Sequence, residues 1–223
     1  MSVPRKSSAA TRERLLRAAE RCFADHGYEG SSLRRITRQA GVNLAGVNYH
    51  FSSKRELWLE MMLRRLNPLN AERVRMLQAA RVATPAGRPI PLEKVCEAMF
   101  LPIAHEFDDG RGSCDILARL AGNAVNVPQS LSKELNRRCL EQIWRLFHTA
   151  VRDALPDVPA SEIDWKFYFL MSSMIGAMAW QGRQPVIDRG VSCNLESMMQ
   201  RLAVFVSGGL RANPPAGKFM SRA

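Results

Sequence analysis

The stretch that decides the fold is Gly41–Phe51, which reads GVNLAGVNYHF. Gly41 permits a sharp turn after a preceding helix, and the residues Leu44–His50 predict a second helix of only about two turns. An isolated helix of that length is marginal in water, so packing must hold it, and Val47 and Phe51 are its predicted anchors. Two short helices around a tight turn are typical of a helix-turn-helix, which places one helix in a groove of DNA.

The residues that follow predict a new helix and a position that favours an anion. Ser53 and Glu56 have the spacing of a capping box, which begins a helix at Lys54. Free main-chain N–H groups and the helix dipole favour an anion at that end, and the Lys54 side chain adds a cation. We therefore expect this helix start to hold a phosphate beside the short helix.

An amphipathic helix is predicted upstream, over residues 11–26, and Gly27 is its natural left-handed stop. Its apolar stripe consists of Leu15, Leu16, Ala19, Cys22 and Phe23. Ser31 or Ser32 can cap the next helix. The outward-facing cations of that next helix are Arg34, Arg35 and Arg38. Residues 1–10 are small, polar and basic, and they predict a flexible arm.

The rest of the chain predicts helices, and no alternating strand pattern competes with them. The helix that begins at Lys54 is expected to end or kink at Pro68, before a further helix over 69–82. The run 84–91, TPAGRPIP, predicts a loop. Later helices are expected over 92–107, 113–126, 130–154, 161–183 and 195–210. Residues 213–223 predict a disordered tail. The expected fold class is all-α.

Composition restricts the class of partner. The chain has 223 residues, of which 46% are hydrophobic, and its net charge is +11. That length can bury one sizeable core or two modest ones. The first 55 residues hold eleven cations and four carboxylates, a net charge of +7. Such a field favours a polyanion, either nucleic acid or an anionic membrane face, but on charge alone a solvated basic surface is an equal alternative.

Other function classes lack their signals. No two of the five cysteines stand at metal-ligand spacing, and no histidine pair does, so we expect neither a metal nor a cofactor. Their odd number, without a signal peptide, indicates reduced thiols in the cytoplasm. The most apolar run, Phe167–Trp180, has 14 residues and is too short to span a membrane. The chain has no nucleophile elbow, P-loop, HExxH motif or paired-carboxylate site, so we do not expect an enzyme.

Five sequence anchors, in order and at matching spacing, resemble the TetR family of bacterial transcriptional regulators. They are Gly27-Tyr28, Ser31–Ile36, Ala40–Val42, Tyr49–Phe51 and Ser53–Leu57. The resemblance implies an all-helical homodimer, with a helix-turn-helix domain over 11–57 and a ligand-binding and dimerisation domain over 58–212. Most members are repressors that leave DNA when a small molecule binds. The partners implied are therefore a double-stranded palindromic operator and a small-molecule effector, with no membrane.

The segment Asn43–Tyr49 and the later helical layout are similar to the PsrA-like branch of that family, which is linked to fatty-acid metabolism. That similarity implies a small apolar, acyl or fatty-acid-type effector. A regulator of the same fold that activates transcription, or that responds to no ligand, stays open as an alternative. A peripheral membrane protein is a weaker one, because the stripe of helix 11–26 fits an internal core better than a lipid surface.

The residues predicted to contact DNA are Ser32, Arg34, Asn43, Leu44, Ala45, Gly46, Asn48, Tyr49, His50 and Lys54. In this set Asn48 is suited to adenine, Leu44 and Ala45 to thymine methyl groups, and Gly46 to a close backbone approach. Arg34 is suited to a guanine or a phosphate. Tyr49, His50 and Lys54 are expected to hold phosphates, which fix register without reading sequence. The chain departs from the family at Asn48, where many members have Tyr, and at Gly46, where many have Ser or Thr.

The second domain is rich in aromatic and methionine residues, which can line an adaptable apolar pocket or form a plain packed core. The predicted pocket residues are Ile103, Phe107, Leu120, Trp144, His148, Met174 and Met178. Arg119 and His148 are polar groups on otherwise apolar helices, suited either to orient a carboxylate or to lie at the surface. The last two helices carry small residues that permit close approach, so we expect a four-helix dimer interface. Its predicted residues are Ser172, Gly176, Trp180, Met198 and Leu202.

Overall fold

The computed structural model describes residues 5–107, 113–180 and 195–212, and all the secondary structure in those ranges is helical. This confirms the all-α fold class. In chain order the elements are α1 (Arg5–His26), α2 (Leu33–Ala40), α3 (Leu44–His50), α4 (Lys54–Ala83), α5 (Leu92–Phe107), α6 (Ser113–Ala124), α7 (Gln129–Leu135), η1 (Asn136–Leu140), α8 (Glu141–Ala154), α9 (Ala160–Trp180) and α10 (Leu195–Arg211).

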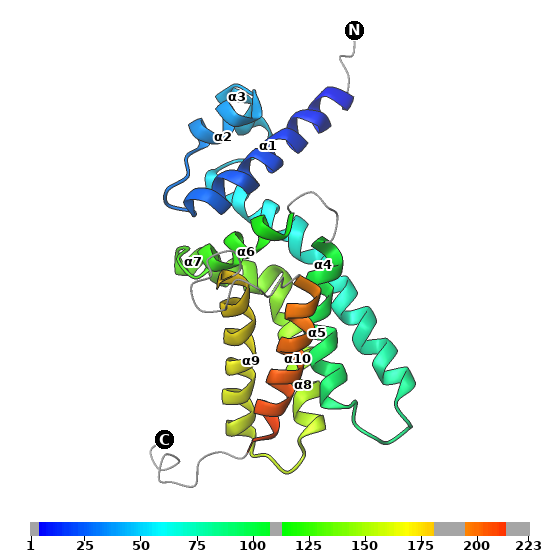
Figure 1. Cartoon of the computed structure of the whole chain (residues 1–223). Coiled ribbons are helices and arrows are strands. Elements are labelled where there is room, and N and C mark those ends of the chain that lie inside the picture. The colour runs from blue at the N-terminus through cyan, green and yellow to red at the C-terminus, as the bar shows by residue number, and fades with distance from the viewer. Residues whose placement is uncertain (1–4, 108–112, 181–194, 213–223) are drawn as a thin grey trace.

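The first three helices and the start of α4 form a head, which stands above the rest of the molecule in Figure 1. Gly27 (φ 67°) follows α1 and Gly41 (φ 61°) follows α2, and both take the left-handed conformation that these turns require. The buried core of the head includes Leu15, Phe23, Ile36, Val47, Phe51, Leu57 and Met61. Leu120 of α6 and Leu131 of α7 join the same core, so it extends well beyond residue 57.

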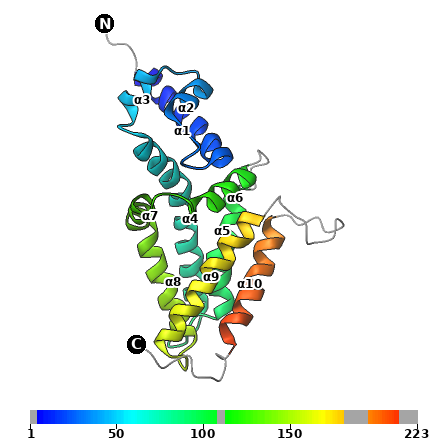
Figure 2. The ribbon, with the colours of Figure 1, turned by 90° about the vertical axis from the view of Figure 1, so that its left-hand side faces the viewer.

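The body below the head is a bundle of longer helices. Figures 1 and 2 show α5, α8, α9 and α10 running beside the second half of α4. The buried core of the body includes Met99, Phe100, Phe147, Ile163, Leu170 and Met199. The loop predicted over 84–91 connects α4 to α5, as expected.

Helix α4 runs unbroken through Pro68, so the prediction that one helix ends there and another begins was wrong. Proline removes one helical hydrogen bond and disfavours a helix interior. Here α4 is buried on both sides of Pro68, with Leu57 and Trp58 in the head core and Leu69 and Leu77 in the body core. Packing at both ends holds the helix continuous against the local preference.

The single helix predicted over 130–154 is in fact three elements, α7, η1 and α8. η1 is a five-residue π-helical segment. The side chain of Asn70 on α4 donates a hydrogen bond from Nδ2 to the main-chain oxygen of Cys139, at 2.8 Å. The contact joins a carbonyl of the π-helical turn to a residue remote in sequence. Helical periodicity alone therefore does not predict the π-helical turn.

Other element ends differ by smaller amounts. α1 begins at Arg5, so at least residues 5–10 of the predicted flexible arm are helical; extending a helix that is already packed adds little free-energy cost. α6 ends at Ala124, two residues before the predicted end. α10 continues to Arg211. The predicted arm residues 1–4, the end of helix 161–183 and the tail 213–223 lie outside the described residues.

Candidate DNA-binding surface and effector pocket

Helix α3 is anchored on one side and exposed on the other. Val47 and the following Phe51 are buried in the head core. On the open side, 42% of Leu44 and 78% of Tyr49 are accessible. A two-turn helix held by two buried anchors can present its remaining face to a partner without rearranging. The structure therefore exposes the helix that the sequence predicts to enter the DNA groove.

Two residues predicted to face DNA have structural roles in the turn. Asn43 caps α3, and its Oδ1 accepts a hydrogen bond from the main-chain N–H of Gly46 at 2.8 Å. A β-carbon built at Gly46 would lie 2.6 Å from Cγ1 of Val42, closer than such atoms approach in proteins. Gly46 therefore makes room for the side chain of Val42 in the turn. This packing role of Gly46 was not predicted from the sequence. The side chains of Ala45 and Asn48 lie outside the described residues, and their base contacts stay predictions.

The aromatic residues at the end of α3 form a short ring cluster. The rings of Tyr49 and His50 meet edge to face with centroids 5.0 Å apart, and those of His50 and Phe51 lie 6.3 Å apart. His50 is half-buried and Tyr49 is exposed. This arrangement fixes the direction of the Tyr49 ring and leaves its hydroxyl accessible, as a phosphate contact requires.

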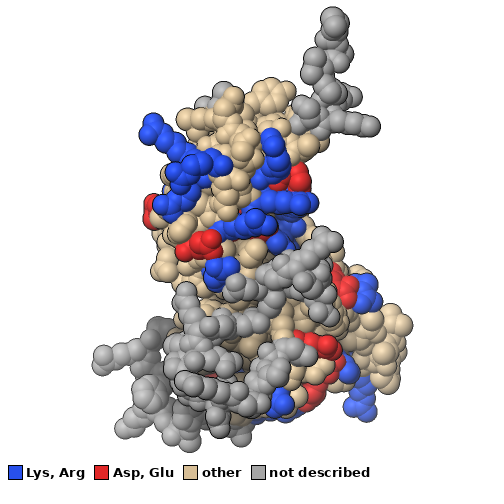
Figure 3. All heavy atoms as spheres, turned by 45° about the horizontal axis from the view of Figure 1, so that its top comes forward, with Lys and Arg blue, Asp and Glu red and all other residues tan. Residues whose placement is uncertain are grey.

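Helix α2 carries three cations that form no ion pair within the described part of the chain. Its cap is Ser32, whose hydroxyl accepts a hydrogen bond from the N–H of Arg35 at 3.2 Å. Arg34, Arg35 and Arg38 are exposed, and none forms an ion pair with a described residue. Figure 3 shows several Lys and Arg side chains gathered on the head. Unpaired cations next to an exposed helix are suited to phosphate oxygens.

The carboxylates of α1, in contrast, are neutralised within the protein. Glu13 accepts two hydrogen bonds from Arg64 of α4, at 2.6 and 2.7 Å, and one from Arg17 at 2.7 Å. The Arg64 guanidinium holds the pKa of Glu13 below its ordinary value of 4.5. Glu20 forms an ion pair with Arg65. The cations of α1 and α4 are thus partly engaged in fixing the head, whereas those of α2 are not.

Lys54 is tied to the loop between α1 and α2. Its Nζ donates to the main-chain oxygens of Tyr28 at 2.9 Å and Ser31 at 3.1 Å. The same nitrogen lies 4.1 Å from the centre of the Tyr28 ring. Two of its three N–H donors are therefore used inside the protein, a structural role that the sequence does not predict. The third N–H has no oxygen acceptor among the described residues, and its contact with a phosphate stays a prediction.

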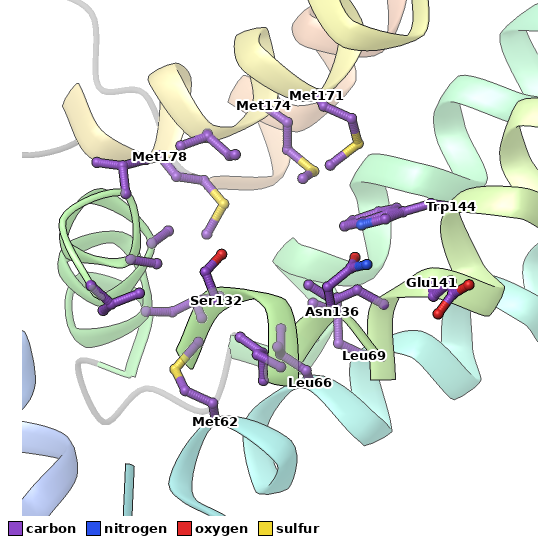
Figure 4. A pocket seen from close by; sticks show the side chains of 18 of the residues that line it. Met62, Leu66, Leu69, Ser132, Asn136, Glu141, Trp144, Met171, Met174 and Met178 are labelled. Atoms are coloured by element: carbon purple, nitrogen blue, oxygen red, sulfur yellow. The ribbon is translucent and has the colours of Figure 1, made fainter. Parts of the chain in front are cut away.

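The body contains a pocket of about 820 Å³ between α4, α5, α6, α7, η1, α8 and α9. Four of the residues predicted for such a site lie along its wall: Ile103, Trp144, Met174 and Met178. Figure 4 shows Trp144, Met171 and Met174 pointing into the same space, and Met62 and Leu66 forming its α4 side. The lining is mainly apolar, which is typical of a site for a small organic molecule.

Two predicted pocket residues lie elsewhere, and the prediction is corrected for both. Leu120 is buried in the head core. His148 is one helical turn beyond Trp144, where its Nε2 lies 2.8 Å from Oδ1 of Asp164 and its ring packs against Phe167. The side chain of a third predicted residue, Phe107, lies outside the described residues.

A buried arginine that was not singled out in the sequence lies at the pocket wall. Arg73 of α4 is only 2% exposed. Its Nε donates to the main-chain oxygen of Met99 at 3.0 Å, and its Nη1 donates to Oδ1 of Asn70 at 3.1 Å. Its Nη2 lies 3.5 Å from the sulfur of Met174. Burial lowers the pKa of Arg73 to about 10, so the group stays charged at neutral pH.

The head and the body are joined by polar contacts from α6. Asn123 donates from Nδ2 to the main-chain oxygens of Phe23, at 3.2 Å, and Ala24, at 2.9 Å, in the last turn of α1. Arg119, one turn earlier, forms an ion pair with Asp25. Arg119 thus serves this joint and does not line the pocket. These contacts fix α6, which forms part of the pocket wall, to the end of α1.

The last two helices expose an apolar surface. On α9, Trp165, Tyr168 and Phe169 are exposed and their rings contact one another. On α10, Val204 and Phe205 are exposed as well. Exposed apolar patches of this kind mark interaction surfaces. None of these five was among the residues predicted for a dimer interface.

The residues that were predicted for that interface lie on the same two helices. Ser172 is exposed, whereas Gly176, Met198 and Leu202 are half-buried. Met198 and Leu202 pack against the body core, so they contribute to the fold of the single chain. A β-carbon at Gly176 would meet no atom within 4 Å. The side chain of Trp180 lies outside the described residues.

Among the described helices, none is long and apolar enough to cross a membrane. Within the same residues, no group of three or more His, Cys, Asp or Glu side chains gathers where a metal ion could be held.

The chain is similar to known proteins in both sequence and structure. Residues 15–61 match the sequence model of bacterial regulatory proteins of the tetR family, and residues 97–209 match that of the tetracyclin repressor-like C-terminal domain. The chain is 42% identical to the HTH-type transcriptional repressor AcnR of Corynebacterium diphtheriae over 188 residues, which cover 84% of this chain and 90% of AcnR. It is 37% identical to the HTH-type transcriptional activator FasR of Mycolicibacterium smegmatis over 95 residues, 43% of this chain and 41% of FasR. In structure it is similar to the ketosteroid transcriptional regulator KstR2 of Mycobacterium tuberculosis, with a TM-score of 0.59 over 89% of this chain and 93% of KstR2; at 19% identity this shows the fold alone.

Proposed function

Because this chain belongs to the TetR family of bacterial transcriptional regulators, we propose that it binds a palindromic operator as a homodimer and leaves it when a small effector enters the body pocket. Family membership makes the chain a DNA-binding regulator and not an enzyme. The identity to AcnR along most of both chains indicates a repressor.

The observation that carries the DNA-binding part is the surface of α3 and α2. α3 is fixed by buried Val47 and Phe51, and it presents Leu44 and Tyr49 outward. Arg34, Arg35 and Arg38 form no ion pair with a described residue, and they lie on α2, the helix that precedes α3 in the helix-turn-helix. In this proposal Leu44, Ala45 and Asn48 meet base edges, while Arg34, Tyr49, His50 and the third donor of Lys54 hold phosphates.

The dimer is supported by the exposed side chains of α9 and α10. Trp165, Phe169 and Phe205 are large apolar groups that a soluble single chain would leave in water. Pairing the same face of two copies about a twofold axis buries them and sets two α3 helices at a fixed spacing. A palindromic operator is the DNA counterpart of that symmetry.

Effector gating is supported by the pocket and by the helices that lead from it. The pocket wall includes Met62, Leu66 and Leu69 of α4, and α4 continues directly into the head. A ligand shifts the DNA-bound state only if it binds one arrangement of the head more tightly than the other. The similarity of residues 43–49 to the PsrA-like branch supports an apolar or acyl effector within this proposal.

A direct test uses DNA from upstream of the gene that encodes this protein. Gel shifts at two salt concentrations, followed by footprinting, are expected to reveal a protected palindrome and binding that weakens steeply with salt. Unrelated DNA of equal length is the control. The absence of any protected palindrome would reject the proposal.

The second candidate is an activating regulator, which the match to FasR favours. A reporter gene under the same upstream DNA separates the two. Repression predicts higher reporter output when this protein is deleted, and activation predicts lower output.

A further inference from the structure

The body contains a buried cation, Arg73, that has no counter-ion among the residues the structure describes. Arg73 is surrounded by the main-chain oxygen of Met99, the amide oxygen of Asn70 and the sulfur of Met174. No described carboxylate forms an ion pair with it. Buried charges in proteins are normally paired, because transfer of a charge from water to an apolar interior is unfavourable.

The hydrogen bonds of Arg73 leave donor capacity unused. A guanidinium has five N–H donors, and two of them reach oxygen acceptors on Met99 and Asn70. A third faces the thioether of Met174, which is a weak acceptor. The other two have no oxygen acceptor among the described residues. This donor set is suited to a planar carboxylate, which accepts two parallel N–H groups.

Although it is buried, Arg73 is one of the residues that line the pocket. Its Nη2 lies 3.5 Å from the sulfur of Met174, and its central carbon lies 5.9 Å from the centre of the Trp144 ring. Figure 4 shows that Met174 and Trp144 both point into the pocket. The amide of Asn136 and the hydroxyl of Ser132 point into the same space from η1 and α7. Polar groups thus converge there while the remaining wall is apolar.

Other charged groups of the lining do not neutralise Arg73. Arg137 pairs with Glu134, and Glu141 pairs with Arg145. Lys133 is exposed. Among the described residues of the lining, Arg73 is therefore the one buried charge; it is positive and matches one negative charge on a ligand.

We propose that the effector is an amphipathic monoanion, whose carboxylate pairs with Arg73 and whose apolar body fills the space lined by Met62, Leu66, Trp144 and Met178. This proposal names the chemical class of the effector and so rests on the proposed function for its regulatory meaning. The binding claim itself needs no DNA. For Arg119 and His148 the sequence left two roles open, orienting a ligand carboxylate or lying at the surface; in this proposal Arg73 takes the first role.

The contacts of Arg73 connect such a ligand to three helical elements. Arg73 belongs to α4, Met99 to α5, and Asn70 links Arg73 to the π-helical turn through the oxygen of Cys139. A carboxylate on the two remaining donors of Arg73 would share one guanidinium with the groups that Met99 and Asn70 contribute. Binding of the ligand's carboxylate is therefore coupled to the packing of α4 against α5 and η1.

The test is a titration of the full-length protein, without DNA, by isothermal calorimetry with two matched pairs of probes. The pairs are decanoate with decan-1-ol and 2-naphthoate with 2-naphthalenemethanol. Each pair shares its apolar body and differs in the charge of the head group. We expect at least one carboxylate to bind about ten- to hundredfold more tightly than its alcohol, the range that a charged hydrogen-bonded pair supplies. Equal affinities within both pairs, or no binding by either carboxylate, would overturn the proposal.

Two variants test whether Arg73 causes the preference for the carboxylate over the alcohol. Arg73→Met keeps the length and apolar stem of the side chain, and it should bring the two members of the pair to within about threefold of each other. Arg88→Gln removes a surface cation far from the pocket and should keep the wild-type preference. A preference that survives Arg73→Met places the anion elsewhere and also overturns the proposal. If Arg73→Met does not fold, the wild-type comparison decides, together with Arg73→Lys.

The outcome is separable from that of the proposed function. Succinate, a carboxylate probe without an apolar body, should bind at least tenfold more weakly than decanoate, and equal binding contradicts the amphipathic part. Selective carboxylate binding without release of operator DNA would reject effector gating by this ligand class and keep the site. Operator binding without any carboxylate preference would reject the site and keep the DNA-binding function.

Discussion

The ammonium nitrogen of Lys54 lies 2.9 Å from the main-chain oxygen of Tyr28 and 4.1 Å from the centre of the Tyr28 ring. The first residue of α4 thereby fastens the loop between α1 and α2. A side chain that is predicted to contact a DNA phosphate therefore also stabilises the loop at the end of the head that faces the body.

Replacing Lys54 by Met should destabilise the protein. Two hydrogen bonds from a charged donor are lost, and the oxygens of Tyr28 and Ser31 lose their partner, so the free energy of unfolding should fall by about 1–3 kcal/mol. Urea denaturation followed by fluorescence measures this. Arg55→Met is the neighbouring control, because its contacts with Ser130 are exposed and long, at 3.4 Å. A Lys54 variant as stable as this control would contradict the structural role.

Replacing Arg34 by Gln should act on DNA binding without affecting the fold. Arg34 is exposed and forms no ion pair with a described residue, so stability should change by less than about 0.5 kcal/mol. If the Arg34 of each protomer neutralises one phosphate, the slope of log K against log salt should become less negative by about 1.8 for the dimer, about 0.9 for each phosphate. Fluorescence anisotropy with operator DNA at four salt concentrations measures the slope. Arg88→Gln, a surface cation on the loop after α4, should keep the wild-type slope; identical slopes for both variants would remove Arg34 from the interface.

Replacing Phe205 by Glu should weaken dimerisation. The ring is 75% exposed in the single chain, and a dimer across α9 and α10 would bury it. An unpaired carboxylate in its place should weaken association by about a hundredfold. Analytical ultracentrifugation gives the dissociation constant. Val82→Glu is the matched control, since Val82 is also exposed but lies at the end of α4. A Phe205 variant that stays as dimeric as the Val82 variant would move the interface elsewhere.

Replacing Asn123 by Ala should loosen the joint between the head and the body. The loss of two hydrogen bonds to Phe23 and Ala24 should lower the free energy of unfolding by about 1–2 kcal/mol. Asn126→Ala removes the same chemical group from an exposed position and should have less than about 0.5 kcal/mol of effect. Thermal melting of both variants checks the difference. Equal melting temperatures would show that the hydrogen bonds of Asn123 do not stabilise the joint.

The pairing of Glu13 predicts how the stability depends on pH. Hydrogen bonding from Arg64 lowers the pKa of Glu13 in the folded protein, so its stabilisation is complete above the unfolded value of 4.5 and is lost as pH falls through the folded value. Relative to Glu13→Gln, the wild type should gain about 0.5–1 kcal/mol at pH 7 and nothing well below pH 4.5. Urea midpoints between pH 7 and pH 3 measure this. The control Glu29→Gln changes an exposed residue that forms no ion pair with a described residue, so it should track the wild type. A constant gap between the Glu13 variant and the wild type would exclude the pairing as its cause.

Elements whose ends are set by nearby residues could be predicted from the sequence. The bounds of α3 follow from Gly41 and the buried anchors, and Ser53 caps α4 as the capping-box spacing predicts. The loop before α5 follows from its prolines. In each case one or two residues within a few positions of the boundary decide the conformation.

Features that depend on contacts between distant helices could not be predicted in this way. Pro68 lies inside a helix because two separate cores hold α4, and η1 is bonded to Asn70, about 70 residues away in sequence. In the sequence alone, Arg73 is one of several cations on a predicted helix. A signal was nevertheless present, because Arg73 lies four residues after Leu69 and four before Leu77, on the face that both leucines bury.

The unbroken course of α4 means that the angle at which the head meets DNA is set by helical phase. Each residue of an α-helix advances the chain by about 100°. One residue inserted between Leu59 and Leu69 would therefore turn α3 through more than a quarter of a circle relative to the body, whereas four inserted residues would nearly restore its direction. Chimeras that join this head to another body must preserve the count of residues along α4, however different the two sequences are.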